Sequence, residues 1–375
     1  MTTRIAILTL AAMVGVSCAS AQQLPERAQI LKTATLVNNY FMKKYADYTA
    51  PSNVGRLRPS NIWTRGVYYE GLMSLYEICP DEACWNYAFD WAQYHKWNYR
   101  NGASTRNADD YCAGQTYIDL SRLTADPTCL RHVRANMAML LSTPQNDDWT
   151  WIDAIQMGMP VLAKLGHDTG DTRYYDKMWS MYACTRNTIG GGLFNTADNL
   201  WWRDADFVPP YVEPNGEDCY WSRGNGWVYA ALVRVMNEIP ATETHYADYL
   251  ADFKAMSDAL SRCQRTDGFW NVSLHCPENF GGPETSGTAL FVYGMAWGIN
   301  RGVLSRETYL PIVARAWNAM AATAVHPDGF LGYVQGTGKE PKDSQPVGYD
   351  TVPDFEDFGV GCFLLAATEV YRIVE

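Results

Sequence analysis

The sequence lacks most of the patterns that mark metal, nucleotide and nucleic-acid chemistry. Its six histidines are far apart, and no His and Cys residues recur at metal-ligand spacing. It has no glycine-rich phosphate loop and no tight turn that presents a nucleophilic serine. Lys and Arg number 30 against 41 Asp and Glu, and they form no basic stripe. We therefore expect no metal, no organic cofactor and no nucleic acid partner.

The chain also lacks an apolar run that would span a membrane comfortably. The apolar stretch at residues 5–16 is too short for a span, but it has the flanks of a secretory signal. Arg4 precedes it, and the small residues Ala19, Ser20 and Ala21 follow it. We predict a signal peptide over residues 1–21, cleavage after Ala21 and export, with the periplasm as the expected compartment.

Cys18 raises the alternative of a lipoprotein anchor. Gly15 argues against that alternative, because this position of a lipobox is usually Leu. Removal of Cys18 leaves nine of the ten cysteines, an odd number that cannot all form disulfides even in an oxidising compartment. No Ser/Gly/Pro-rich linker divides residues 22–375, which we therefore predict to form a single domain.

Two kinds of predicted helix alternate along residues 22–375. One kind is amphipathic, with charged residues and Tyr on a solvent-exposed face. The other is rich in Gly, Ala and apolar residues, as buried helices are. Six of each predict an all-α fold, the (α/α)6 barrel of six outer and six inner helices. The expected outer helices are 26–48, 81–96, 126–142, 171–189, 245–264 and 306–324. The expected inner helices are 64–77, 109–123, 151–165, 224–238, 286–302 and 358–373.

Polar and aromatic residues gather where the inner helices begin. Inner helices of such a barrel run in one direction, so their N-termini converge at one end and favour an anionic ligand there. Carboxylates, arginines and indoles at one end predict a binding cleft, and flat rings beside polar groups suit a sugar. The residues concerned are Trp63, Thr64, Arg65, Asp109, Asp110, Trp149, Trp151, Asp153, Trp221, Arg223, Asn225, Glu284, Thr285, Ser286, Asp354, Glu356 and Asp357.

Asp153 is the main catalytic candidate. Trp149 and Trp151 would remove water and favour its neutral form, whereas the helix N-terminus favours the anion. A carboxyl held between these limits can give and take a proton near neutral pH. The alternative for an isolated Asp at a helix start is a simple N-cap, which is the commoner role.

The other candidates also have structural alternatives. Asp109 and Asp110 suit an N-cap pair as well as catalysis. Arg223 has Glu217 and Asp218 as partners in the preceding loop. Trp227 suits the hydrophobic core, and Arg203 with Asp204 suits a loop-shaping pair.

Several runs at these positions resemble glycoside hydrolase family 105, the unsaturated rhamnogalacturonyl and glucuronyl hydrolases. The resemblance covers nearly the whole mature chain. It lies in Arg65-Gly66, Tyr69-Glu70-Gly71, residues 107–115, Trp151-Ile152-Asp153, Gly158-Met159-Pro160, residues 220–227, residues 284–289 and residues 357–361. The run Tyr-Trp-Ser-Arg-Gly-Asn-Gly-Trp at 220–227 is its most specific part.

The resemblance implies removal of a terminal 4,5-unsaturated uronic acid from lyase-generated oligosaccharides by hydration of its double bond. It places the proton donor to C4 at Asp153 and an assisting carboxylate at Asp109 or Asp110. It places the sugar-holding residues at Arg223 and Trp221. Our full set of substrate-binding candidates is Arg223, Trp221, Trp151, Trp149, Trp63, Arg203, Asn195 and Trp227.

One departure concerns the loop after Gly192-Leu193-Phe194. The family often has His shortly after this motif, where Asn195 stands here. Arg203 or Asn195 is expected to take over that sugar contact. The alternatives are a family 88 hydrolase of glycosaminoglycan disaccharides, a non-catalytic glycan-binding protein and an (α/α)6 polysaccharide lyase. The two carboxylate positions argue against a mere binder, and the absence of His at the inner-helix N-termini argues against a lyase.

Overall fold

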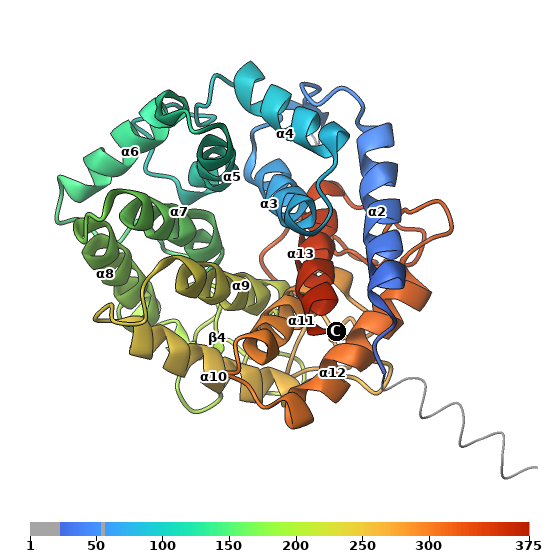
Figure 1. The fold of residues 1–375 in the computed structure, drawn as a ribbon. Coiled ribbons are helices and arrows are strands. Elements are labelled where there is room, and N and C mark those ends of the chain that lie inside the picture. Colours follow the sequence, from blue (N-terminus) through green and yellow to red (C-terminus); the bar gives the residue numbers. More distant parts are fainter. Residues whose placement is uncertain (1–22, 54–56, 375) are drawn as a thin grey trace, which may run out of the picture.

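The computed structural model describes residues 23–53 and 57–374, and within them two rings of helices form a barrel (Figure 1). The predicted signal peptide and Cys18 lie outside the described residues. The outer helices are α2 (Arg27–Lys44), α4 (Glu82–Tyr94), α6 (Arg131–Leu141), α8 (Arg173–Asn187), α10 (Tyr246–Arg262) and α12 (Arg306–Ala319). The inner helices are α3 (Trp63–Ile78), α5 (Ala108–Thr124), α7 (Asp153–Thr169), α9 (Ser222–Glu238), α11 (Thr285–Asn300) and α13 (Asp357–Ile373).

Each inner helix packs against the next, and α13 packs against α3, so the inner ring is closed. The predicted (α/α)6 architecture is confirmed, and every predicted inner and outer helix matches an observed one. The outer segments at 126–142 and 306–324 change helix type: η1 (Pro127–Leu130) precedes α6, and η3 (Met320–Ala324) follows α12.

Glycine permits the contact that closes the ring. A Cβ at Gly361 on α13 would lie 2.2 Å from the carbonyl oxygen of Val67 on α3. A Cβ at Gly71 would lie 2.4 Å from the carbonyl oxygen of Gly361. No side chain fits at these distances, so the two backbones approach each other because both positions are Gly.

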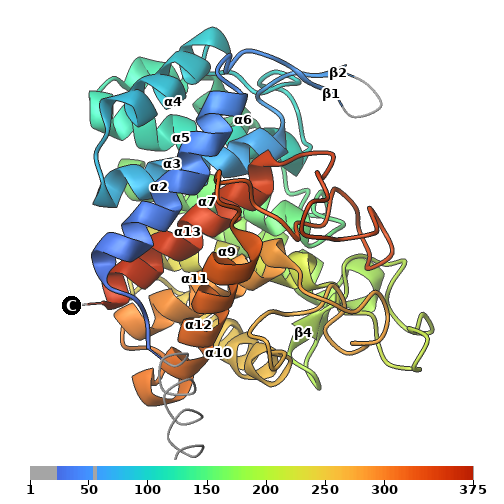
Figure 2. The same cartoon turned by 90° about the vertical axis from the view of Figure 1, so that its right-hand side faces the viewer.

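Loops and short strands cover the end of the barrel where the inner helices begin (Figure 2). The strands form two antiparallel pairs, β1 (Ser52–Asn53) with β2 (Leu57–Arg58) and β3 (Phe194–Asn195) with β4 (Leu200–Trp201). The helix η2 (Ile189–Gly191) precedes β3. The segment between η3 and α13 crosses this end of the barrel, so loops decide which inner-helix N-termini remain accessible.

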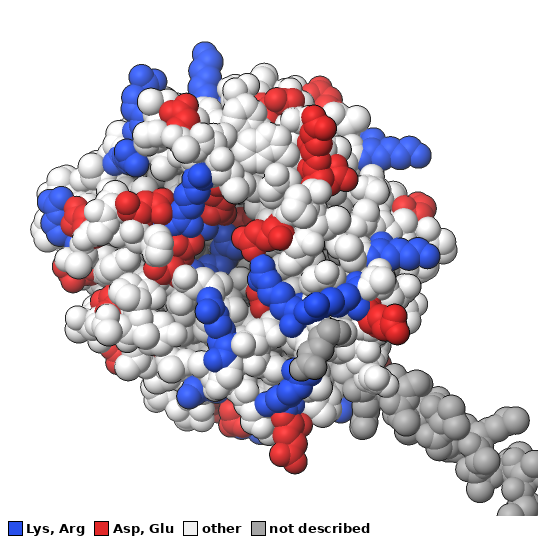
Figure 3. All heavy atoms as spheres, viewed as in Figure 1, with Lys and Arg blue, Asp and Glu red and all other residues white. Residues whose placement is uncertain are grey.

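The opposite end is hollowed at its centre and lined by acidic and basic side chains (Figure 3). These side chains lie near the C-termini of the inner helices. Lys164 contacts both Asp119 and Glu238, and Arg372 contacts Glu77 and Glu369. Cations at helix C-termini offset the negative end of the helix dipoles, which gives this network a structural role.

The described region contains nine cysteines. All nine of its cysteines are free thiols. Across residues 23–53 and 57–374, no helix combines the length and apolarity that crossing a membrane requires.

Candidate active site

A cavity of about 390 Å³ opens among the loops at the N-terminal ends of the inner helices. Three inner helices and the segments before them contribute to its wall, and the covering loops contribute the rest. The lining residues are Arg58, Ile62, Trp63, Arg100, Asn107, Asp109, Trp151, Asp153, Met157, Arg203, Thr337, Gly338 and Phe355. The cavity therefore brings together five of the predicted site residues: Trp63, Asp109, Trp151, Asp153 and Arg203.

Asp153 is the first residue of α7, and its carboxylate faces Arg203. Nε of Arg203 donates to Oδ2 of Asp153 at 3.1 Å. The N-cap position of α7 is Ile152, which makes no side-chain cap bond. The N-cap alternative therefore does not describe Asp153, whose side chain lines the cavity and is 11% exposed.

Backbone pairing holds Arg203 in this place. The amide of Ile152 donates to the carbonyl of Arg203 at 3.0 Å, and Trp151 forms an antiparallel bridge with Asp204. Nη1 of Arg203 also donates to Oδ2 of Asp204 at 2.6 Å. Asp204 thus orients the guanidinium of Arg203. The pair shapes the loop, as the sequence predicted, and Arg203 also lines the cavity.

Asp109 is the second carboxyl in the cavity, and its pKa is raised to about 7. Burial is the largest cause, and the negative charge of Asp153 is the next. Arg100 and Arg203 oppose this shift. At neutral pH a large fraction of Asp109 is therefore protonated.

Asp110 has a different environment, although it is the next residue of α5. It is buried and accepts hydrogen bonds from Arg100 Nε at 3.0 Å, Asn101 Nδ2 at 2.9 Å and Thr105 Oγ1 at 2.7 Å. The cap of α5 is Asn107, whose Oδ1 accepts from the amide of Asp109. Of the two assisting carboxylates that the sequence left open, only Asp109 lines the cavity.

The predicted tryptophans divide into two groups. Trp63 and Trp151 line the cavity and are partly exposed. Trp227 is fully buried and supports Trp63 edge to face, with 6.1 Å between ring centroids. Trp149 is also fully buried and packs on α7, where a Cβ at Gly158 would lie 2.9 Å from its ring. Trp149 and Trp227 are therefore core residues in this structure.

Arg223 and Trp221 also lie outside the cavity wall, each 1% exposed. Arg223 donates from Nη1 to the carbonyl of Gln335 at 2.7 Å and from Nη2 to the carbonyl of Gly336 at 2.6 Å. Trp221 stacks on the guanidinium and donates from Nε1 to Oε1 of Gln335 at 2.9 Å. Together they hold the segment whose next residue, Thr337, lines the cavity; the direct sugar contact expected of them is not available in this conformation.

Asn195 lies in β3 and does not line the cavity. Its Nδ2 donates to the hydroxyl of Tyr220 at 2.7 Å and to carboxylates of Asp198 and Asp218 at 3.3 Å. Of the two replacements expected for the family histidine, only Arg203 is placed to meet a ligand in this cavity.

Some of the residues that line the cavity were not predicted from the sequence. Arg58, Thr337, Gly338 and Phe355 belong to covering loops or to β2, and Arg100 belongs to the turn after α4. Asn225, in contrast, lies in the most specific sequence run: its side chain pairs with both backbone groups of Trp201 in β4. The side chain of Asn225 makes the two hydrogen bonds that a neighbouring strand would make, and so it shapes the loop that leads to Arg203. Its position in the sequence alone did not reveal this role.

Comparisons with known proteins identify the family of this chain. The profile of glycosyl hydrolase family 88 matches residues 33–374. The chain belongs to this family. It is therefore a glycoside hydrolase.

Three similar proteins match over most of their length. The unsaturated 3S-rhamnoglycuronyl hydrolase of Formosa agariphila is 29% identical over 89% of this chain and 90% of its own. The solved structure of a family 88 glycosyl hydrolase from Bacteroides vulgatus is 32% identical, with a TM-score of 0.85, covering 93% of this chain and 100% of that one. A structure described as a polysaccharide lyase is 30% identical, with a TM-score of 0.83 and coverage of 92% and 98%.

The family 105 resemblance is shown at the level of fold. A family 105 hydrolase structure from C. acetobutylicum is 18% identical, with a TM-score of 0.71, covering 90% of this chain and 98% of that one.

Proposed function

We propose that this glycoside hydrolase removes a terminal 4,5-unsaturated uronic acid from oligosaccharides that a polysaccharide lyase has produced. The observation that carries the proposal is one cavity holding Asp109, Asp153 and Arg203. Two carboxyls supply acid and base chemistry, and a guanidinium suits the carboxylate of a uronate. Membership of family 88 and the similarity to a rhamnoglycuronyl hydrolase support the same substrate class.

The proposed reaction is the addition of water across the C4=C5 bond. A proton from the enzyme adds to C4, and the oxygen of water adds to C5 while its proton passes to a carboxylate. The resulting C5 hemiketal opens the ring, and the rest of the glycan leaves from C1 with a proton. No oxidant or reductant is consumed, and the enzyme ends with the proton it began with.

Asp153 is the proposed donor to C4 and then the base that activates water. Arg203 contacts Asp153, and burial and the charge of Asp153 raise the pKa of Asp109. A substrate carboxylate bound to Arg203 would compete for its guanidinium and place a negative charge beside Asp153. Both effects favour the protonated form of a carboxyl, and Asp109, which is electrostatically coupled to Asp153, is the proposed source of the proton.

The indole faces of Trp63 and Trp151 provide the apolar part of the proposed sugar site. We place the unsaturated ring between these indoles and the Asp109–Asp153 pair. The loop residues Thr337 and Gly338 would then meet the adjoining sugar. Similarity to an unsaturated 3S-rhamnoglycuronyl hydrolase supports rhamnose at that position, and glycosaminoglycan-type amino sugars are the alternative.

The predicted signal peptide at 1–21 makes the proposed place of action an exported compartment. Lyase products would reach the enzyme there as soluble oligosaccharides. Cell fractionation with an antibody against the mature chain tests this point: recovery in the cytoplasmic fraction at full length would contradict export.

One assay tests the proposed function against its rivals. The C4=C5 bond conjugated to the carboxylate absorbs ultraviolet light, so a hydrolase lowers the absorbance of an unsaturated disaccharide. A lyase acting on an intact polyuronide raises it, and a binding protein changes neither. A panel with rhamnose, glucose, galactose or an amino sugar next to the uronate would identify the substrate.

A further inference from the structure

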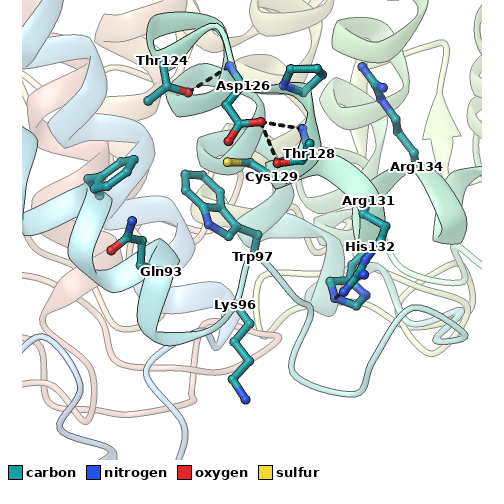
Figure 4. A pocket seen from close by; sticks show the side chains of 12 residues that line it. Gln93, Lys96, Trp97, Thr124, Asp126, Thr128, Cys129, Arg131, His132 and Arg134 are labelled. Atoms are coloured by element: carbon teal, nitrogen blue, oxygen red, sulfur yellow. Dashed lines mark hydrogen bonds between the residues drawn. The ribbon is translucent and has the colours of Figure 1, made fainter.

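A second concave site lies on the outside of the barrel, between the end of α4 and the η1–α6 segment (Figure 4). Its volume is about 860 Å³, larger than that of the cavity holding Asp153, and the two share no lining residue. Such a volume is within the range for ligand sites. Nothing in the proposed reaction uses this groove.

The groove is basic on a protein whose formal net charge is −11. Lys96, Arg131 and Arg134 line it and are exposed. In the part of the chain that the structure describes, none of the three forms an ion pair with a carboxylate. The acidic lining residue Asp126 accepts hydrogen bonds from the amide and hydroxyl of Thr128, which keeps its carboxylate turned to η1. An anion in the groove therefore meets cations whose charge is not already neutralised.

An indole forms part of the same wall. Trp97 packs edge to face against Phe89, which also lines the groove, and against Tyr117, with 5.7 Å between ring centroids in each pair. Lys96 and Trp97 both have left-handed backbones, with φ of 54° and 55°. Two successive non-glycine residues rarely adopt this conformation. The packing therefore holds the indole in a set position beside the flexible cations of the groove.

We infer that this groove is a second carbohydrate site that binds an acidic oligosaccharide, an inference that rests on the proposed function. An indole supplies the flat apolar surface on which a sugar ring stacks, and Lys and Arg bind carboxylate or sulfate groups on the same chain. A neutral glycan would use only the indole, and a small inorganic anion only the cations. The combination selects a sugar chain that carries repeated negative charges.

Such a site would act as an anchor. A long substrate held at the groove raises the local concentration of its ends near the enzyme, without any new contact in the catalytic cavity. A disaccharide is too short to gain from it. The site thus predicts a dependence of KM on chain length that the catalytic cavity alone does not.

The test combines a charge-reversed variant with a probe that is not a substrate. The variant is Lys96→Glu/Arg131→Glu/Arg134→Glu, whose side chains are all exposed. The matched control is Lys254→Glu, an exposed lysine on α10, across the barrel from the groove. The probes are saturated tetragalacturonate, a sulfated galactan tetrasaccharide and neutral maltotetraose, titrated by calorimetry into the full mature chain.

We expect wild type and Lys254→Glu to bind at least one acidic probe, more weakly at high salt, and the triple variant to bind it at least about tenfold more weakly. The galacturonate and sulfated probes distinguish carboxylate from sulfate recognition. Equal binding by the triple variant, or equal binding of maltotetraose, would overturn the inference.

Kinetics separates this inference from the proposed function. In the triple variant, kcat/KM for an unsaturated disaccharide should stay at the wild-type value, while KM for a long unsaturated oligouronide rises. If no unsaturated substrate loses absorbance but the acidic probe still binds at the groove, the proposed function fails and the groove stands. If KM is unchanged for every chain length, the anchoring role is contradicted.

Discussion

Arg203 donates from Nε to Oδ2 of Asp153 at 3.1 Å, in a cavity that Asp109 also lines. This contact joins Asp153, the proposed proton donor, to Arg203, the guanidinium proposed to bind the uronate. Asp204 holds the other end of the same guanidinium. A change at Arg203 should therefore affect Asp153 as well as the binding of substrate.

Replacement Asp153→Asn should abolish hydrolysis while the fold is kept. An amide cannot give and then recover a proton, so kcat should fall by at least about 10²–10⁴-fold. Loss of ultraviolet absorbance from an unsaturated disaccharide measures this, and calorimetry checks that the disaccharide still binds. Asp110→Asn is the comparison: it should lower the melting temperature, because Asp110 holds Arg100, Asn101 and Thr105, and should spare most of kcat. Full activity of Asp153→Asn would remove it from the mechanism.

Asp109 should give the protein a distinctive pH dependence. Its pKa rises from the ordinary 3.8 to about 7, so the folded protein binds this proton more tightly than the unfolded chain. The stabilisation is complete below about pH 4 and is lost as pH rises to about 7, amounting to about 4 kcal/mol at most. Asp109→Asn should therefore raise the free energy of unfolding more at pH 8 than at pH 4.5. Denaturant titrations at both pH values measure the difference; an equal effect at both would contradict the raised pKa.

Arg203→Gln should weaken substrate binding. The variant loses the charged partner proposed for the uronate, an interaction of about 1.5–3 kcal/mol, so Kd should rise about 10–100-fold. Titration of an unsaturated disaccharide into a background that also carries Asp153→Asn isolates binding from turnover. Arg106→Gln is a matched control, since it breaks an Arg–Asp pair with Asp148 outside the cavity. An unchanged Kd in Arg203→Gln would show that another residue binds the uronate.

Arg223→Gln should act first on stability. The carbonyls of Gln335 and Gly336 would lose their donors inside the protein, which costs about 2–4 kcal/mol. Trp221→Phe keeps an aromatic ring on the guanidinium but removes the bond to Gln335, so its effect should be smaller. Thermal unfolding ranks the two variants. If Arg223→Gln kept a normal melting temperature but showed a large rise in Kd, the result would support the direct contact between Arg223 and the sugar that the sequence predicted.

Gly361→Ala should destabilise the barrel, although Ala is the better helix former. Its Cβ would meet the carbonyl of Val67 at 2.2 Å, so α3 and α13 must separate. We expect a loss of about 1–3 kcal/mol, opposite in sign to the gain of about 1 kcal/mol at an unconstrained helical Gly. Denaturant unfolding decides the sign, and a stabilised variant would show that the ring tolerates a wider spacing.

The fold was predictable because inner and outer helices differ in composition along their whole length. Runs such as α11, buried at almost every position, contrast with α10, which alternates exposed and buried residues. That contrast is local and is repeated six times. The helix ends were also predictable to within a few residues, because polar residues and Gly mark them.

The site was predictable only in part, because the N-terminus of an inner helix does not reveal what covers it. Asp109 and Asp153 lie in the first turns of helices that line the cavity, whereas Arg223 lies in the first turn of a helix that residues 335–336 cover. Glu284 caps its own helix, α11, because its side chain accepts hydrogen bonds from the amides of Ser286 and Gly287. Which loop covers which helix depends on contacts over a hundred residues apart, and no local pattern encodes them.

The contact of Gly361 with Val67 also has a consequence for how the protein is made. It joins the first inner helix of the chain to the last, so α3 has no partner on one side until α13 has been synthesised. During translation the growing chain should form an open arc with one face of α3 uncovered, and the ring can close only once α13 has been made. A truncation within α13 therefore removes the closure of the whole barrel along with one helix.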